Sequence, residues 1–121
     1  MSIYKDEILE HFNDPQNFGK LESFSINARQ TNPFCGDDIE LFIKLNNNKM
    51  EDIGFTGKGC AISIASASIL TEFSKQKKTS ELLSFSEKDM LDLLTIDISE
   101  TRKKCAMLAL ATLHDALKKY A

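Results

Sequence analysis

The sequence predicts an α+β fold, with an antiparallel sheet in the first half of the chain and helices in the second. Residues 39–45, IELFIKL, alternate apolar and polar side chains, which is typical of a strand with one buried face. From Ala61 onward the apolar period becomes that of a helix, with one stripe formed by Ile62, Ala65, Ile69 and Phe73. A sheet followed by helices that cover it indicates an α+β sandwich.

One helix is expected before the sheet. Residues 2–13 place three apolar side chains at helical spacing, namely Tyr4, Ile8 and Phe12. The dipeptide Asp14-Pro15 then ends this helix, because proline cannot continue a helical hydrogen-bond pattern.

Three strands follow this helix. Residues 24–30, FSINARQ, form the first and weakest of them, and residues 39–45 form the second. The asparagine-rich turn at residues 46–49 leads to a third strand at residues 50–57, since asparagine tolerates the positive φ of a tight hairpin. The expected architecture is therefore a three-stranded antiparallel sheet packed against helices.

The second half of the chain is expected to be helical. Ser86 and Asp89 have the spacing of a capping box, so a short helix should include MLDLL at residues 90–94. Ser99 or Thr101 begins the last helix, whose apolar side consists of Cys105, Leu108, Thr112, Leu113, Ala116, Leu117 and Tyr120. The sequence contains no repeat and no linker, so residues 1–121 are expected to form a single domain.

The composition excludes several classes of protein. A net charge of −3 argues against nucleic-acid binding, because no broad basic surface is implied. No apolar stretch approaches the roughly 20 residues of a membrane span, and the polar N-terminus has no signal-peptide pattern. Three cysteines without a secretory signal indicate the reducing cytoplasm, and an odd number fits ligands better than disulfides.

The three cysteines lie at three expected joints of the fold. Cys35 is in the loop NPFCGDD before a strand, Cys60 stands between a strand and a helix, and Cys105 is near the start of the last helix. Their separations of 25 and 45 positions do not match the C-x-x-C pairs of structural zinc sites. Spacing alone therefore identifies no known type of zinc site.

Local context leaves two interpretations of the cysteines. Cysteine is a small hydrophobe, so each thiol fits a core; a thiolate at a helix start, however, is stabilised by unpaired N–H groups. Asp37 lies two residues after Cys35, so three thiolates and one carboxylate would make a complete tetrahedral set for a soft metal. With Zn²⁺ this set has a net charge of about −2, which nearby cations would offset, namely Lys58, Arg102, Lys103 and Lys104.

Four motifs resemble the IscU/NifU/SufU family of iron–sulfur cluster assembly proteins over nearly the whole chain. They are YKDEILEHFNDPQNFG, NPFCGDDI, GFTGKGCAISIASASILTE and RKKCAMLAL, in that order. The resemblance implies an α+β sandwich with a three-stranded sheet. It also implies a scaffold or sulfur carrier, rather than an enzyme in the strict sense, that accepts sulfur from a pyridoxal-phosphate-dependent cysteine desulfurase of the SufS or IscS type. Apo-proteins or other Suf scaffold components would receive the product.

The same resemblance implies the site residues. The family's three cysteine ligands correspond to Cys35, Cys60 and Cys105, and its aspartate corresponds to Asp37. These four would hold Zn²⁺ in the resting protein, and the cysteines would hold a transient cluster, most simply [2Fe-2S]. We expect Cys35 to be the sulfur acceptor, because it alone lies in a loop bounded by proline and glycine, away from any helical stripe.

Two departures separate this chain from the Isc branch of the family. Lys104 stands where that branch has a histidine, and DISETRK replaces its chaperone-binding Leu-Pro-Pro-Val-Lys stretch. Both departures argue against chaperone-driven release of a cluster. Lys104 and the stretch GKGCAISIASAS resemble the Suf branch, a zinc-bound sulfur relay, although this chain lacks the insertion that many Suf members carry.

The alternative functions are a zinc domain with a purely structural or binding role and a catalytic zinc enzyme. No general base is evident next to the cysteines, which argues against the enzyme. His11 and His114 are interpreted as surface or packing residues rather than ligands.

Overall fold

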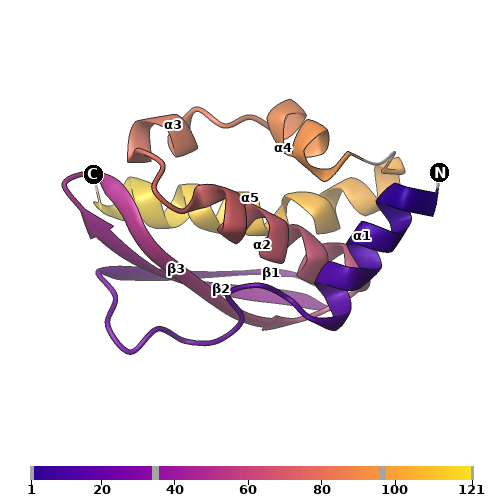
Figure 1. The fold of residues 1–121 in the computed structure, drawn as a ribbon, viewed down its shortest axis with the longest axis horizontal. Coiled ribbons are helices and arrows are strands. Elements are labelled where there is room, and N and C mark those ends of the chain that lie inside the picture. The colour runs from indigo at the N-terminus through magenta and orange to yellow at the C-terminus, as the bar shows by residue number, and fades with distance from the viewer. Residues whose placement is uncertain (1, 34–35, 96–97, 121) are drawn as a thin grey trace.

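The computed structural model describes residues 2–33, 36–95 and 98–120, and it confirms the α+β fold (Figure 1). Within these ranges a three-stranded antiparallel sheet has the order β1-β2-β3. The elements, in chain order, are α1 (Ser2–Asn13), β1 (Ile26–Asn32), β2 (Asp37–Asn46), β3 (Lys49–Lys58), α2 (Ala61–Ser74), α3 (Thr79–Leu83), α4 (Glu87–Leu94) and α5 (Glu100–Tyr120).

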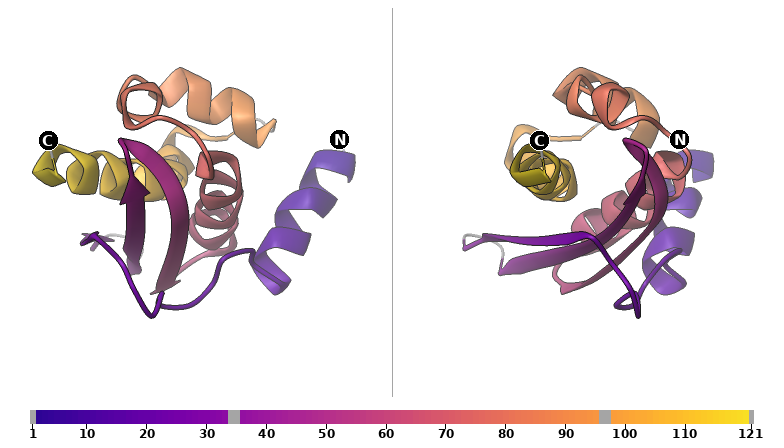
Figure 2. Two further views of the ribbon diagram at one scale, coloured as in Figure 1. Left: turned by 60° about the vertical axis from the view of Figure 1, so that its left-hand side comes forward. Right: turned by 90° about the vertical axis from the view of Figure 1, so that its left-hand side faces the viewer.

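The helices form two layers on one face of the sheet. Helices α2 and α5 lie directly on the sheet, and α3 and α4 lie over them on the outer side (Figures 1 and 2). Helix α1 packs beside α2 at one end of the molecule. None of the described helices has the length and apolar content needed to cross a membrane.

The hairpin of β2 and β3 forms as predicted. Asn47 and Asn48 both have positive φ, 54° and 60°, which matches the twist of a two-residue turn. Ile39, Leu41 and Ile43 are fully buried against the helices, and Leu45 is partly buried beside a register shift. The period-two pattern therefore identified the core face of β2 correctly.

The other face of β2 is not simply polar, as the alternation had suggested. Phe42 is buried there, and its ring packs edge-on against Phe24 with centroids 5.2 Å apart. The segment between α1 and β1 runs along this side of the molecule and supplies Phe24 (Figure 1). Strand β1 accordingly begins at Ile26, two residues later than predicted.

The same segment is fastened to β3 by its backbone. The Gly19 N–H donates to the Phe55 carbonyl at 2.7 Å, and the Phe55 N–H donates to the Asn17 carbonyl at 3.0 Å. Gly54 permits this close approach, because a Cβ there would lie 2.5 Å from the Gly19 carbonyl oxygen.

Helix α2 is buried on nearly all sides, which differs from the single stripe predicted for it. The structure leaves Ile62 and Phe73 only partly buried, whereas the small polar side chains of α2 are fully buried, namely Ser63, Ser66, Ser68, Thr71 and Ser74. The helix is enclosed because β3, α1, α4 and α5 all pack around it. Small side chains allow this close packing, as the sequence had indicated.

Candidate metal centre

Three of the four predicted ligands meet at one end of the sheet. Asp37 is the first residue of β2, Cys60 precedes α2, and Cys105 is in the second turn of α5. One ligand atom from each lies within 4.8 Å of the other two. Asp37 and Cys105 are buried, at 1% and 2% exposure, whereas Cys60 is partly exposed. The cluster is therefore closed on the core side and accessible at Cys60.

Asp37 uses its two carboxylate oxygens differently. Oδ1 accepts a hydrogen bond from the backbone N–H of Cys60 at 2.9 Å. Oδ2 is buried and has no hydrogen-bond partner within the described part of the chain. A buried carboxylate oxygen without a donor is costly unless a cation satisfies it, so this atom fits a metal ligand.

Gly59 makes the contact between Asp37 and Cys60 possible. Its φ is +151°, a conformation that favours glycine, and a Cβ at this position would lie 2.3 Å from Asp37 Oδ1. The glycine before Cys60 is therefore required both by the backbone and by the carboxylate beside it.

Cys60 occupies the N-cap position of α2. Its backbone is extended (φ −72°, ψ 166°), its side chain caps no helical N–H, and the first turn of the helix contains no acidic residue. The sulfur consequently lies at the positive end of the helix dipole, a place that suits a negatively charged metal ligand. This placement agrees with the prediction made from GKGCAIS.

The donor set fits a thiophilic metal ion. A tetrahedral zinc ion with Zn–S bonds of about 2.3 Å separates its ligand atoms by roughly 3.8 Å. Atoms that already lie within 4.8 Å of one another need only a small contraction to reach that spacing. Two sulfurs and a carboxylate oxygen also match the ligand preference of zinc and iron.

Cys35, the fourth predicted ligand and the predicted sulfur acceptor, lies outside the described residues. The residues on either side of that gap, Pro33 and Gly36, are both exposed. Its participation in the site stays a prediction.

Two of the cations expected near the cluster, Lys58 and Lys103, act on neighbouring carboxylates. Arg29, which was not expected there, has a larger effect. Arg29 donates two hydrogen bonds to Asp38 and so holds the pKa of Asp38 below its usual range, and the charge of Lys58 adds a smaller contribution. Lys103 pairs with Glu100 at 2.7 Å.

The two histidines have packing roles, as predicted. His11 Nδ1 lies 2.7 Å from Ser68 Oγ, which also accepts the Gln16 N–H, so α1 is fastened to α2. His114 Nε2 lies 2.9 Å from the Leu82 carbonyl oxygen and connects α5 to α3.

Sequence reasoning missed one residue of the centre, Ser63. It is fully buried, and its hydroxyl lies 3.7 Å from Cys60 Sγ and 3.3 Å from the Cys105 carbonyl oxygen. The signal was present in the sequence, because a residue three positions after an N-cap cysteine lies on the same face of the helix.

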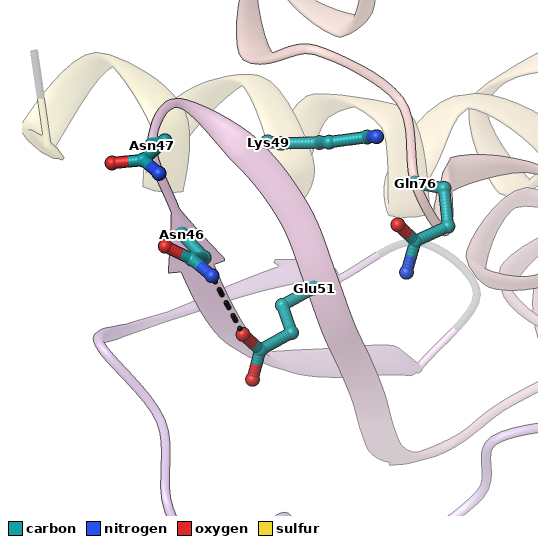
Figure 3. A pocket seen from close by; sticks show the side chains of 5 residues that line it. All are labelled: Asn46, Asn47, Lys49, Glu51 and Gln76. Carbon is teal, nitrogen blue, oxygen red and sulfur yellow. Dashed lines mark hydrogen bonds between the residues drawn. The ribbon is translucent and has the colours of Figure 1, made fainter.

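A hollow lies at the other end of the β2–β3 hairpin from the cysteine cluster. Its volume is about 300 Å³, and it is lined by Asn46, Asn47, Lys49, Glu51 and Gln76 (Figure 3). The amide of Asn46 donates to Glu51 at 3.2 Å, so two of these polar groups already satisfy each other. This hollow contains no thiol or imidazole and is a weaker candidate than the cysteine cluster.

Comparison with known proteins agrees with this geometry. The sequence model of the NifU-like N-terminal domain matches residues 3–121. The iron–sulfur cluster assembly scaffold protein IscU 1 of Archaeoglobus fulgidus is 34% identical over 118 residues, covering 98% of this chain and 76% of the relative. The zinc-dependent sulfurtransferase SufU of Bacillus subtilis is 35% identical over 135 aligned positions, covering 98% of this chain and 91% of the relative.

A solved structure has the same fold. It is described as a candidate iron–sulfur cluster assembly scaffold protein for the SUF system from Fervidobacterium islandicum. It superposes with a TM-score of 0.83 at 26% identity and covers 96% of this chain and 97% of its own. Sequence and fold agree, and the chain belongs to the family of NifU-like N-terminal domains.

Proposed function

We propose that this protein takes part in iron–sulfur cluster assembly by accepting sulfur from a pyridoxal-phosphate-dependent cysteine desulfurase. The observation that carries the proposal is the convergence of Asp37, Cys60 and Cys105, with a buried carboxylate oxygen left without a donor in the described chain. The names of its relatives, an IscU scaffold and a zinc-dependent SufU sulfurtransferase, support the same role. Free thiols suit such work in the reducing cytoplasm.

The proposed resting state has Zn²⁺ bound by Cys35, Asp37, Cys60 and Cys105. A bound zinc ion keeps the coordinating thiols deprotonated at neutral pH. Asp37 is the weakest of the four ligands for a thiophilic ion, because a carboxylate is a harder donor than a thiolate. Its second oxygen stays attached to the Cys60 N–H, so the carboxylate is held in place whether or not it binds the ion.

Cys35 is the proposed sulfur acceptor. Its thiolate attacks the terminal sulfur of the desulfurase persulfide; a new S–S bond forms on Cys35, and the old S–S bond breaks. The desulfurase cysteine leaves as a thiolate, so the sulfur changes carrier without any external oxidant or reductant. Cys60 is at the N-cap of α2 and Cys105 is buried in the second turn of α5, so both are suited to holding the metal ion or cluster rather than to carrying sulfur.

The cargo of the protein is sulfur or a small cluster. In the relay form, persulfide sulfur passes to other Suf scaffold components. In the scaffold form, an external electron donor reduces each persulfide sulfur to sulfide with two electrons, iron joins the sulfide, and a [2Fe-2S] cluster is held by Cys35, Cys60 and Cys105 before transfer to apo-proteins. Lys104, in place of the Isc-branch histidine, favours the relay.

Incubation with a cysteine desulfurase, cysteine and radiolabelled sulfur tests the proposal. Wild type and Cys105→Ser should retain label that withstands gel filtration and is released by a reductant, and Cys35→Ser should lose it. Full labelling of Cys35→Ser together with loss from Cys105→Ser would show that another thiol accepts the sulfur. A zinc-loaded wild type that takes up no label would favour the alternative, a zinc domain with a structural or binding role.

A further inference from the structure

Ser63 connects two of the candidate ligands through a single hydroxyl group. It is the third residue of α2 and is fully buried. Its Oγ lies 3.7 Å from the sulfur of Cys60 on one side and 3.3 Å from the backbone carbonyl of Cys105 on the other. A buried side chain in this position links the start of α2 to the ligand-bearing turn of α5.

The hydroxyl has only one proton to donate. In the metal-free protein the Cys60 thiol donates to Ser63 Oγ, and the Ser63 hydroxyl donates to the Cys105 carbonyl. A sulfur bound to a metal ion has no proton and acts only as an acceptor. The Ser63 proton then has two competing acceptors, the Cys60 sulfur and the Cys105 carbonyl.

The sulfur is the stronger of these two acceptors. Hydrogen bonds to an ionised acceptor are roughly twice as strong as neutral ones. The carbonyl of Cys105 lies inside α5, where a helical N–H four residues later already satisfies it. When the Ser63 hydroxyl turns toward the sulfur, the Cys105 carbonyl therefore still has its helical hydrogen-bond donor.

We infer that Ser63 is a positioning residue of the metal centre, which donates its hydroxyl proton to the Cys60 sulfur when that sulfur binds a metal ion. The inference rests on the proposed metal site. The hydrogen bond holds Cys60 in its ligating orientation and withdraws electron density from the sulfur, as outer groups do around other metal ligands.

Ser66 provides a matched control one turn further along α2. It is equally buried, and its Oγ has no hydrogen-bond partner among the described residues. Replacing either serine by alanine removes the same atom from the same helix. Only the change at Ser63 removes a contact with a candidate ligand.

Anaerobic titration with Co²⁺ tests the inference, because the sulfur-to-cobalt charge-transfer band reports electron donation from the ligating sulfurs. In Ser63→Ala the band should move to longer wavelength and the affinity for Co²⁺ should fall about tenfold or more. Ser63→Thr, which keeps the hydroxyl, should restore the wild-type band, and Ser66→Ala should resemble wild type in both measurements.

The outcomes separate this inference from the proposed function. Cobalt bound by Ser63→Ala with an unchanged band, or an equal shift in Ser66→Ala, would overturn the role of Ser63 and leave the metal site standing. A wild type that binds no Co²⁺ would overturn the metal site and the inference together. Should Ser63→Ala not fold, wild type loaded with ¹¹³Cd provides the test: the Ser63 hydroxyl proton should show coupling to cadmium through the hydrogen bond, and absence of that coupling overturns the inference.

Discussion

The backbone N–H of Cys60 donates to Oδ1 of Asp37 at 2.9 Å, so one candidate ligand holds another in place. The two residues are far apart in the chain, and the bond connects the start of β2 to the start of α2. Asp37 therefore has two separable functions: one oxygen supports the local fold, and the other is available to a cation.

Substitution of Asp37 should separate these two functions. Asp37→Ala removes the charged acceptor of the partly buried Cys60 N–H, so the metal-free protein should lose about 1–3 kcal/mol of unfolding free energy in urea denaturation. Asp37→Asn retains a carbonyl oxygen for that N–H and should lose less. Both should bind zinc more weakly than wild type. Equal destabilisation by the two changes would show that the hydrogen bond contributes little to stability.

Gly59 should be intolerant of any side chain for a reason beyond backbone strain. Gly59→Ala places a Cβ 2.3 Å from Asp37 Oδ1, so Asp37 must shift and zinc binding should fall. Gly19→Ala is the matched control, because Gly19 also has positive φ, +132°, but a Cβ there would meet nothing within 4 Å. Both variants should be destabilised by about 1 kcal/mol or more, and metal analysis should show reduced zinc only in Gly59→Ala. Full zinc occupancy in Gly59→Ala would contradict this account.

Local patterns in the sequence predicted most of the elements. The capping box at Ser86 and Asp89 forms with bonds of 2.9 and 3.1 Å, and the asparagine turn forms at Asn47 and Asn48. These features depend on a few adjacent residues, so the sequence determines them directly. The convergence of Asp37, Cys60 and Cys105 was also anticipated, because the family resemblance named these residues together and each lies at or near the start of an element.

Features that depend on several distant segments could not be predicted. The burial of α2 on all sides requires α1, α4, α5 and β3 together, and periodicity within one helix carries no information on its neighbours. The short helix α3 has too few residues for a periodic pattern. The role of Ser63 depends on its contact with the Cys105 carbonyl, 42 positions away in the sequence, which exists only in the folded chain.

The ion pair next to the centre predicts a measurable pKa change. Arg29 donates to Asp38 and lowers the pKa of Asp38 in the folded protein. Ionised Asp38 therefore stabilises the fold at pH values above its ordinary pKa of 3.8. This contribution is lost as the pH falls through the lower pKa of the folded state. Arg29 is largely exposed, so the effect on stability should be small. In Arg29→Ala, the pKa of Asp38 measured by NMR titration should rise toward 3.8. The pKa of Asp89, lowered by Ser86, should not move; an unchanged Asp38 would show that Arg29 is not its main partner in solution.

Metal removal should destabilise the whole fold, because the centre joins β2, α2 and α5. The unfolded chain has no preformed site, so the binding free energy adds to the folding free energy. We expect one Zn²⁺ per chain, and free zinc at a hundred times its Kd would add about 2.7 kcal/mol. A chelator should then lower the Tm by roughly 10 °C.

Cys60→Ala should contain little zinc and melt at the same temperature with and without chelator, which controls for direct effects of the chelator on the protein. A wild-type Tm indifferent to chelation, or normal zinc content in Cys60→Ala, would show that these residues do not form a metal centre that stabilises the fold.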